Sequence, residues 1–494
     1  MNLVEDITDL LRVAFGRGLL SEMTPRGALR LGRSYARGRR DTFVTVATAA
    51  VNEPHAVAVT DEDRSWTREE LHQAAIGLSM WLRGQGIQRR QRVAVVLENR
   101  AEWFIAMAAL MDLGAVPLPM SAKLPAVELD RRLERADCTY AIGRDLLVDS
   151  PAWQAALATP PARPGLLNWS WGQGEVMLHT SGTTGRSKGA SISTSGARLG
   201  TPFRYIEAFD LRRGDRLYTP CPLYHGAPIL LTGLSMICGV EVVTTRTFEP
   251  ERLRECTHAF LVPTLMERLA EMELELPRMR GLISGGALLR ADTKRRLLHA
   301  YGPVLYDFYG ATELGVVSVA SPDDLRLKPH GVGRPLRGVE VKLAPDGELF
   351  VRSDMLTAYE GVDDDSPFAG WASAGDVARI EDDGTLVIID RKKDMVCSGG
   401  VNLFPAEIEE RVEEHPQVRE AACAGRPDET WGESLHCWFV GVATAEELRA
   451  FCKERMAPYE VPKSFTRIDA IPRSPEGKVL RRALTSGSSL PPTA

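Results

Sequence analysis

The sequence predicts an α/β fold, with a large layered body followed by a smaller C-terminal domain. Helix and strand patterns alternate from residue 66 onward, which is typical of a parallel sheet covered by helices. Strand pairs around Asp-Gly turns at 346–347 and 383–384 indicate β-hairpins later in the chain. The charged segment 390–394 then separates a last stretch that has its own strand and helix patterns, as a linker before a small domain would.

The first helix and strand patterns follow from caps and apolar spacing. Thr67 and Glu70 form a capping box, and the helix that they begin has one apolar face and ends near Gly84. That face consists of Leu71, Ala74, Ala75, Leu78, Trp81 and Leu82. The next elements are predicted as a buried strand at Val93–Leu97, an apolar helix at Ala101–Leu113, a strand at 115–120, a charged helix at Glu128–Arg135 and a strand at Thr139–Ile142.

Strand patterns resume further along and then change to hairpins. The next strands are predicted at Val240–Thr245, Ala259–Val262, Leu282–Ser284 and Val304–Phe308. The hairpins are predicted to pair Val339–Leu343 with Leu349–Arg352, and Val377–Ile380 with Leu386–Ile389. We therefore expect a layered body that carries a β-rich portion at its end.

Composition excludes several classes of protein. The 494 residues have a net charge of −6, which does not favour nucleic-acid binding. Eight cysteines lie between Cys138 and Cys452 without CxxC pairs, as expected of thiols in a reducing cytosol. The apolar run Ala227–Val240 is too short to span a membrane, and acidic residues near the N-terminus argue against a signal peptide. We expect a cytoplasmic protein without stable membrane insertion.

Four arginines recur at helical spacing near the N-terminus, in a stretch without acidic residues: Arg26, Arg30, Arg33 and Arg37. They could contact a membrane surface or an anionic partner. A basic helix that lies on the protein's own acidic surface, or that is simply solvated, is favoured, because the opposite face is not richly apolar.

The segment His179–Ala190 reads HTSGTTGRSKGA and is a candidate phosphate-binding loop. Its glycines let backbone N–H groups approach an anion, its hydroxyls add donors, and Lys188 supplies positive charge. It does not fit a Walker A loop, because Ser187 and Gly189 flank the lysine where that motif needs Gly and Ser or Thr. The alternative is a flexible Ser/Thr/Gly connection between strands.

Further motifs follow this loop in order: PLYHGAP (222–228), VPTL (262–265), SGGALL (284–289), DFYGATE (307–313), SAGD (373–376), DRKKDMVCSGGVNLFPAEIEE (390–410) and PRSPEGKVLRR (472–482). With them the chain resembles the ANL superfamily of adenylate-forming enzymes, in its acyl-CoA synthetase branch, from about residue 50 to 485. The resemblance implies a body of layered αβαβα sheets with a β-rich subdomain, and a small mobile α+β C-terminal domain. It places an N-terminal extension at 1–50, the large domain at 51–391, a hinge at 392–393 and the small domain at 394–494.

The resemblance also implies a nucleotide site. Tyr309, with its aromatic face, joins Gly285, Gly286 and Asp307 around adenine, and Asp376 and Arg391 hold the ribose. Thr312 contacts the α-phosphate, and Glu313 holds Mg²⁺ through a hard carboxylate oxygen. The full set of implied nucleotide-binding residues is Thr180, Ser181, Gly182, Thr183, Thr184, Gly185, Lys188, Gly285, Gly286, Ala287, Asp307, Phe308, Tyr309, Gly310, Asp376 and Arg391.

Lys478 matches the family lysine that stabilises charge between the carboxylate and the α-phosphate, and Lys478, Glu313, Thr312 and His225 are the implied catalytic residues. Because this lysine must leave before a thiol enters, the resemblance implies rotation of the small domain about Lys393. Ser398, Gly399 and Gly400 would then line the coenzyme A tunnel. The implied acyl pocket comprises Tyr224, His225, Gly226, Ala227 and Gly310.

The segment LYHGAPILL has no acid, which favours an apolar carboxylic acid over an amino acid. Gly226, Ala227, Leu230, Leu231 and Gly233 would keep such a pocket uncharged, and fatty, aryl and polycyclic acids all stay open. Free coenzyme A is favoured as the thiol over a separate carrier protein, with ATP and Mg²⁺ as the other requirements. A homodimer stays an option. Ser187 and Ala374 depart from the family's usual proline and threonine.

Three functions therefore stay in view. The first is a complete ATP-dependent acyl-CoA ligase. The second is a relative that performs only thioester formation on a preformed acyl-adenylate. The third is a non-catalytic protein that binds acyl nucleotides, which the intact Lys478 and Glu313 disfavour.

Overall fold

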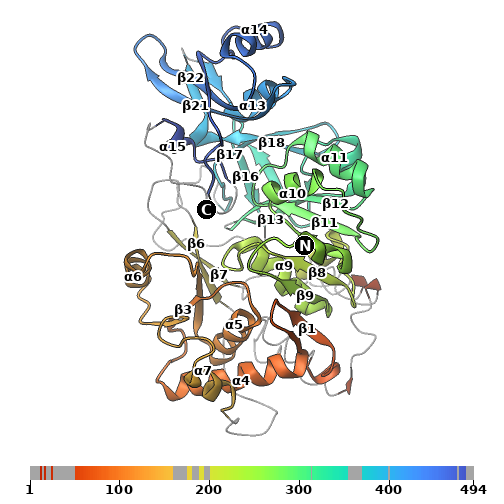
Figure 1. Cartoon of the computed structure of the whole chain (residues 1–494), viewed down its shortest axis with the longest axis vertical. Helices are drawn as coiled ribbons and strands as arrows, with labels where there is room; N and C mark the ends of the chain where they lie inside the picture. The colour runs from red at the N-terminus through yellow and green to blue at the C-terminus, as the bar shows by residue number, and fades with distance from the viewer. Residues whose placement is uncertain are drawn as a thin grey trace.

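The computed structural model describes residues 12, 13, 16, 17, 24, 25, 50–159, 175–180, 188–193, 201–312, 314–353, 370–398, 401–474 and 478–485, with only the backbone described at 175, 179, 180 and 188–193. Within this described part, no helix has the length and apolar character that crossing a bilayer requires. The described elements form an elongated molecule in which the small C-terminal domain sits at one end (Figure 1).

A nine-stranded sheet forms the centre of the large domain. Across the sheet its strands are β14 (Arg334–Pro335), β13 (Gly315–Ala320), β12 (Leu305–Ala311), β11 (Gly281–Gly285), β10 (His258–Phe260), β8 (Arg216–Thr219), β9 (Glu241–Thr244), β1 (Val57–Thr60) and β2 (Ser65–Thr67). The six strands from β12 to β1 are parallel to their neighbours, and the outer strands pair antiparallel. This confirms the expected parallel sheet.

Helices cover both faces of this sheet, and each face has its own apolar core. Residues of α8 (Thr201–Ala208) and α9 (Gly226–Cys238) pack with Phe260, Ile283 and Phe308 on one face. Residues of α10 (Pro263–Ala270) and α11 (Ala291–Tyr301) pack with neighbouring strand residues on the other. A short helix α12 (Pro322–Leu327) follows β13. Strand alternation thus sends successive residues of β11 and β12 to opposite cores.

The alternating strands and helices between residues 92 and 142 do not join the nine-stranded sheet; their strands form a second sheet. Strands β3 (Arg92–Val96), β4 (Val116–Met120) and β5 (Tyr140–Ile142) form a separate parallel sheet in the order β4-β3-β5. Helices α4 (Arg68–Gly84) and α5 (Ala101–Leu113) lie between the two sheets, in a core that contains Val59 and Val242 of the large sheet and Val93 of the small one. Helix α6 (Ala126–Arg135) covers the far side of the small sheet, and α7 (Pro151–Leu157) packs on α4. The layers are therefore αβαβα.

Local sequence accounts for the two sandwiched helices. Thr67 and Glu70 form both bonds of the predicted capping box of α4. All residues of α5 are buried, as expected of a helix that is apolar on every side, and Gly114 ends it in the left-handed conformation, with φ of 76°.

Two hairpins form the β-rich portion of the large domain. Strands β15 (Glu340–Leu343) and β16 (Leu349–Arg352) pair, as do β17 (Asp376–Ile380) and β18 (Leu386–Arg391), and both hairpins are antiparallel as predicted. Their apolar residues share a core with Leu314, Val317 and Val332. Strands β6 (Glu175–Thr180) and β7 (Lys188–Ser193) form a further antiparallel pair.

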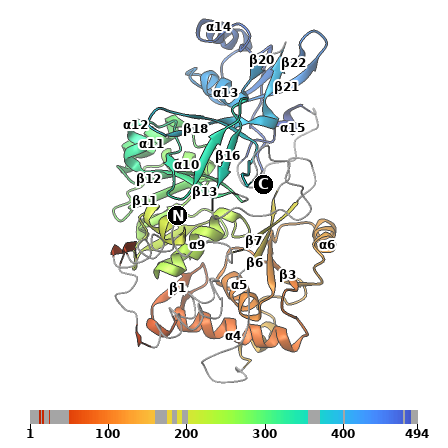
Figure 2. The same ribbon diagram turned by 180° about the vertical axis from the view of Figure 1, so that it is seen from behind.

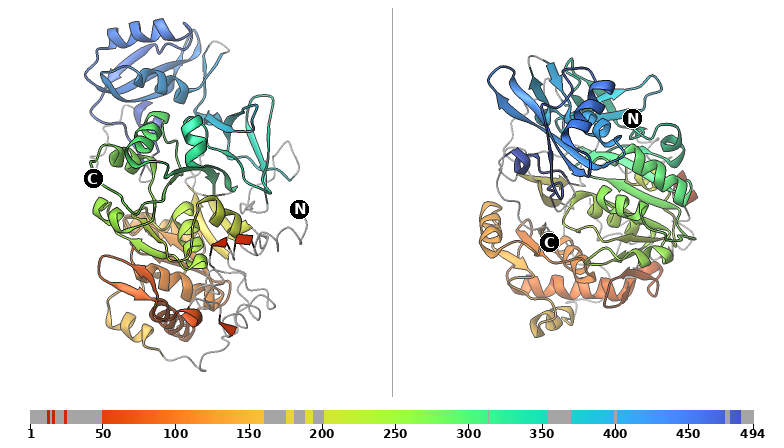
Figure 3. Two further views of the ribbon diagram at one scale, coloured as in Figure 1. Left: turned by 90° about the vertical axis from the view of Figure 1, so that its right-hand side faces the viewer. Right: turned by 45° about the horizontal axis from the view of Figure 1, so that its top comes forward.

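The small domain has its own sheet and core. Its strands are β19 (Val396–Ser398), β20 (Val401–Leu403), β21 (Val418–Asp428), β22 (Gly432–Gly441) and β23 (Ser464–Arg467). Its helices among the described residues are α13 (Pro405–Glu413), α14 (Ala445–Arg455) and α15 (Arg481–Thr485), after the 3₁₀ turn Lys392–Asp394. Figure 2 shows α13 next to α11 of the large domain, and Figure 3 shows the small domain, in blue, set on the end of the layered body.

The few described residues near the N-terminus dock on the large domain. Val13 is buried in the core beside α8, Arg12 forms an ion pair of 2.7 Å with Glu207, and Arg17 pairs with Asp210. The four arginines at helical spacing lie outside the described residues: Arg26, Arg30, Arg33 and Arg37.

Candidate active site

Tyr309, Asp376 and Arg391 come together from three different strands. Asp376 begins β17 and Arg391 ends β18, and the two residues face each other in the hairpin register. The Tyr309 hydroxyl donates to Oδ2 of Asp376 at 2.7 Å, and Nε of Arg391 lies 2.9 Å from Oδ1. Asp376 is buried, and each of its oxygens keeps a further lone pair for another donor. The three residues therefore form a fixed acceptor site with an aromatic ring beside it.

The loop that follows β11 provides an open surface near this cluster. Gly285 pairs with Phe308 of β12, and a Cβ at Gly285 would lie 2.3 Å from the Phe308 ring, so only glycine fits there. Gly286 has φ of 85°, is exposed, and would meet nothing within 4 Å if it carried a Cβ. Ala287 follows, half-buried. Backbone is thus presented to open space at the end of β11, as a flat ligand would need.

Asp307 and Phe308 support the site from beneath. The carboxylate of Asp307 is buried 2.7 Å from Nζ of Lys294, which also donates to the Gly331 carbonyl at 3.1 Å. Burial raises the pKa of Asp307 above its ordinary value, against the attraction of Lys294. Phe308 packs edge-on against Phe209, with ring centroids 5.6 Å apart. The described contacts of both side chains are with the protein interior, and they hold β12 so that Tyr309 reaches Asp376.

A second group of predicted residues meets at the start of α9. His225 precedes the helix in extended conformation, and its ring lies 4.3 Å from that of Tyr224. A Cβ at Gly226 would lie 3.5 Å from Oγ1 of Thr312 and equally far from Leu178 of β6. Gly310 is needed for the turn of β12 into β13, because a Cβ there would lie 2.4 Å from the Gly315 carbonyl oxygen. Helix α9, the end of β12 and β6 therefore converge.

The two strands that flank the candidate phosphate-binding loop pair with each other near this convergence. Thr180 ends β6 and pairs with Lys188, which begins β7. Residues Ser181, Gly182, Thr183, Thr184 and Gly185, as well as Glu313, lie outside the described residues. Within the described part, no three His, Cys, Asp or Glu side chains gather as a metal site.

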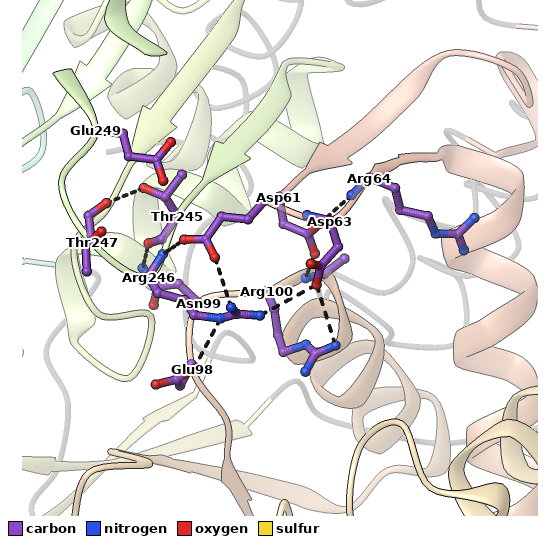
Figure 4. A network of polar contacts seen from close by, with 12 residues as sticks. Asp61, Asp63, Arg64, Glu98, Asn99, Arg100, Thr245, Arg246, Thr247 and Glu249 are labelled. Carbon is purple, nitrogen blue, oxygen red and sulfur yellow. Dashed lines mark hydrogen bonds and ion pairs between the residues drawn. The ribbon is translucent and has the colours of Figure 1, made fainter. Parts of the chain in front are cut away.

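Asn99, which the sequence did not single out, fixes the loop that leads to His225. Its buried amide donates to the carbonyls of Cys221 and Thr245 at 3.0 and 3.1 Å, and its oxygen accepts from the Leu223 N–H at 3.0 Å. Figure 4 shows Asn99 among the polar side chains that join the end of β3 to the end of β9. A lone Asn after a strand is a common loop residue, so only its three bonds reveal this role.

Asn99→Ala is expected to destabilise the protein and loosen the 221–225 loop. The change leaves two buried carbonyls and one buried N–H without their partner, at a cost of about 2 kcal/mol or more. Denaturant unfolding measures this cost against Gln73→Ala, which removes an exposed amide of α4. Equal stability of the two variants would contradict the role of Asn99.

The segment between the domains, residues 390–394, contacts both of them. Lys392 pairs with Asp346 and Glu348 of the large domain at 2.8 and 2.7 Å. Asp390 accepts from the Ala406 N–H at the start of α13 at 2.8 Å, and burial raises its pKa to about 6. Lys393 follows Lys392 directly in the chain, and burial lowers the pKa of its ammonium group.

Lys478 is carried on a short hairpin of the small domain. Arg473 and Val479 pair across its base, and the Ser474 N–H donates to the Lys478 carbonyl at 2.8 Å. Lys478 is exposed, and α15 follows directly. Ser398 pairs with Val401 in the β19–β20 hairpin, whereas Gly399 and Gly400 lie outside the described residues.

Comparison with known proteins identifies two family matches. The model of the AMP-binding enzymes matches residues 46–357, and that of the AMP-binding enzyme C-terminal domain matches residues 407–478. A 2-succinylbenzoate–CoA ligase of Listeria monocytogenes is 27% identical over 461 residues, covering 88% of this chain and 97% of the relative. An acyl–CoA ligase of Bacillus subtilis, YhfT, is 28% identical over 466 residues, covering 88% and 96%.

A solved structure of similar fold holds a reaction intermediate. The o-succinylbenzoate CoA synthetase of Bacillus subtilis, in complex with its acyl-adenylate, has a TM-score of 0.78 and 25% identity, covering 89% of this chain and 97% of that one. The same synthetase has also been solved with ATP and magnesium ion. The chain belongs to the AMP-binding enzymes of the adenylate-forming ANL superfamily, among the AMP-forming acid–thiol ligases.

Proposed function

We propose that this protein uses ATP to activate an apolar carboxylic acid as an acyl-adenylate and then transfers the acyl group to coenzyme A. The observation that carries this proposal is the Tyr309–Asp376–Arg391 cluster, which lies at the end of the strands that also deliver Gly286 and Thr312. An aromatic ring, a buried carboxylate with spare acceptors and an open glycine backbone suit the adenosine of ATP.

The nucleotide would lie across these elements in one direction. Adenine would occupy the open space beside Gly286 and the Tyr309 ring, and the ribose hydroxyls would donate to Asp376. The phosphates would extend toward Thr312 and the loop between Thr180 and Lys188. Glu313 has the hard oxygen that Mg²⁺ prefers, and a magnesium ion there would neutralise phosphate charge. In this proposal the large domain spans residues 51–391.

Acid activation requires the acid carboxylate to attack the α-phosphorus as pyrophosphate leaves. Thr312 lies beside the start of α9, where His225 and Gly226 would border the acyl group. Lys478 would stabilise the negative charge that develops on the α-phosphate, and the N–H groups at the start of α9 add positive potential to the same region.

The acyl group is expected to be apolar. Helix α9, read GAPILLTGLSMIC, has no charged side chain, although its Leu231 is fully buried in the core and does not face open space. Fatty, aryl and polycyclic acids fit this description. The relatives named for 2-succinylbenzoate make that aryl acid one to include among the test substrates, although its second carboxylate does not fit an apolar pocket.

Thioester formation would follow a rotation of the small domain, residues 394–494, about a hinge at 392–393. Lys393 separates the attachment of Lys392 to the large domain from the attachment of Asp394 to Arg481. After rotation, Ser398, Gly399 and Gly400 would admit the thin pantetheine chain of coenzyme A. A carrier-protein thiol is the second candidate.

Screening a panel of carboxylic acids for AMP release, with and without coenzyme A, tests the proposal. We expect acid-dependent ATP–pyrophosphate exchange and an acyl-CoA product identified by mass. Thioester formed only from supplied acyl-adenylate would replace the complete ligase by the half-reaction alternative. Binding of acyl-adenylate without either reaction would leave the non-catalytic alternative.

A further inference from the structure

Five charged residues meet where the two domains touch, and we call them the interdomain cluster. Its members are Glu267 of α10 and Arg290 at the start of α11, from the large domain, with Glu413 of α13, Glu420 of β21 and Arg473 from the small domain. Nη1 of Arg290 lies 2.7 Å from Oε1 of Glu413, across the domain boundary, and Nε of Arg290 lies 3.5 Å from Oε1 of Glu267. The second arginine, Arg473, donates from Nε to Glu420 at 3.1 Å.

The members of the cluster act on one another across the boundary. Burial raises the pKa of Glu267, the positive charges of Arg290 and Arg473 lower it, and the negative charge of Glu420 raises it, so residues of both domains act on this carboxyl group. The Glu413 side chain is only 13% exposed and accepts from the Ala421 N–H at 2.8 Å. Burial raises the pKa of Glu413 to about 7 despite the attraction of Arg290. An ion pair whose carboxylate is this buried is costly to break on one side only.

Each arginine of the cluster is connected through a short stretch of chain to the proposed chemistry. Arg290 ends the loop that begins with Gly285 and Gly286, where adenine is expected. Arg473 pairs with Val479 at the base of the hairpin that carries Lys478. The cluster therefore joins the nucleotide loop of one domain to the lysine hairpin of the other.

The hairpin proposed for coenzyme A lies elsewhere in this orientation. Ser398 of β19 pairs with Gly432, which lies at the turn between β21 and β22. That end of the β21–β22 hairpin points away from the large domain, and Figure 2 shows β20 beside β22 at the outer end of the molecule. The contacts of the interdomain cluster thus accompany an orientation in which the β19–β20 hairpin lies away from the large domain.

We propose that Arg290 and Glu413, supported by Glu420 and Arg473, are positioning residues. The contact between Arg290 and Glu413 would hold the small domain so that Lys478 faces the nucleotide, and it must break before thioester formation. This inference rests on the proposed function for its kinetic consequence. Its structural consequence, a preferred orientation of the two domains, does not depend on any substrate.

Glu413→Gln tests the inference by removing one charge of the cluster with little change in shape, in assays at about pH 8, above the Glu413 pKa of about 7. We expect acid-dependent ATP–pyrophosphate exchange to fall roughly tenfold, while thioester formation from supplied acyl-adenylate stays equal or rises. Glu420→Gln should have the same effect as Glu413→Gln, because Arg473 loses its partner: exchange should fall, and thioester formation should not. Glu241→Gln is the matched control, because it removes a half-buried ion pair with Arg216, 2.9 Å long, that lies within the large domain. A proportional fall of both half-reactions in Glu413→Gln would indicate a merely structural role and overturn the proposal.

Domain orientation is measured without substrate by fluorescence energy transfer. Cys397 is exposed whereas the other seven cysteines are buried, so it takes one dye, and a cysteine in place of the exposed Leu327 takes the other. We expect one dominant dye-to-dye distance in the parent protein. In Glu413→Gln, the population with a different distance should be at least roughly tenfold larger than in the parent. Identical distance distributions would overturn the proposal. If no acid supports either half-reaction, the proposed function fails, and this measurement still decides the role of the cluster.

Discussion

Lys478→Ala should lower acid-dependent ATP–pyrophosphate exchange by about 100-fold or more, the largest effect that we expect from a single substitution. The reason is electrostatic, because the lysine would supply positive charge where negative charge develops on the α-phosphate. The hairpin itself should survive, since Ser474 and Lys478 bond through the Lys478 backbone groups. Thioester formation from supplied acyl-adenylate should stay within about twofold of the parent rate, because Lys478 would leave the site before that step.

The control for Lys478→Ala is Lys453→Ala, which removes another exposed lysine of the small domain, from α14. Initial rates of both half-reactions in the two variants provide the comparison. Exchange that persists in Lys478→Ala at near the parent rate would exclude the lysine from acid activation, and with it the proposed order of the two steps.

Asp376→Asn should weaken AMP and ATP binding by roughly 10- to 100-fold, the second largest effect. Asp376 now accepts from Tyr309 and faces the Arg391 guanidinium, and an amide can accept at only one of its two positions. The substituted residue would place its NH2 group toward either Arg391 or Tyr309, and it would lose the negative charge and one of the two acceptor oxygens that the ribose hydroxyls need. Titration calorimetry with AMP measures the loss directly.

Asp383→Asn is the matched control for Asp376→Asn, because Asp383 lies at the turn of the same β17–β18 hairpin and is exposed. Its ion pair with Arg334, 3.3 Å long, holds no part of the proposed site. We expect AMP affinity in this variant to match the parent. Equal affinities in all three proteins would remove Asp376 from the nucleotide site.

The elements that were predicted well are those in which local sequence and burial agree. The helix Ala101–Leu113 has the predicted bounds, because an apolar run that ends at a glycine specifies both its burial and its end. The Asp346-Gly347 and Asp383-Gly384 turns likewise specify their hairpins, since glycine accepts the positive φ that each turn requires.

The division of the strands into two sheets could not be predicted from the alternation of helix and strand patterns alone. Strands β3 and β9 have the same apolar pattern, and only the packing of α4 and α5 between them separates their sheets. The same limit holds for Asn99, whose partners lie more than 100 residues away in the chain. Contacts between distant segments depend on the assembled fold, and a single polar residue after a strand gives no sign of them.

The alternation of side chains along β12 divides residues 307–310, all of which were predicted to bind the nucleotide, into two groups. Adjacent residues of β12 point to opposite faces, so Phe308 enters the core while Tyr309 reaches Asp376. The buried partner of Asp307, Lys294, lies on α11 and has no motif of its own. The sequence therefore indicated the candidate site, and the fold separates Tyr309, which contacts Asp376, from Asp307 and Phe308, which contact the protein interior.

A crystal structure with bound AMP tests the central claim most directly, namely that one nucleotide pocket is built from the ends of β11, β12 and the β17–β18 hairpin. We expect the base to lie between Gly286 and the Tyr309 ring, with both ribose hydroxyls on the Asp376 carboxylate. A base bound away from Tyr309, with the sugar out of reach of Asp376, would contradict the account.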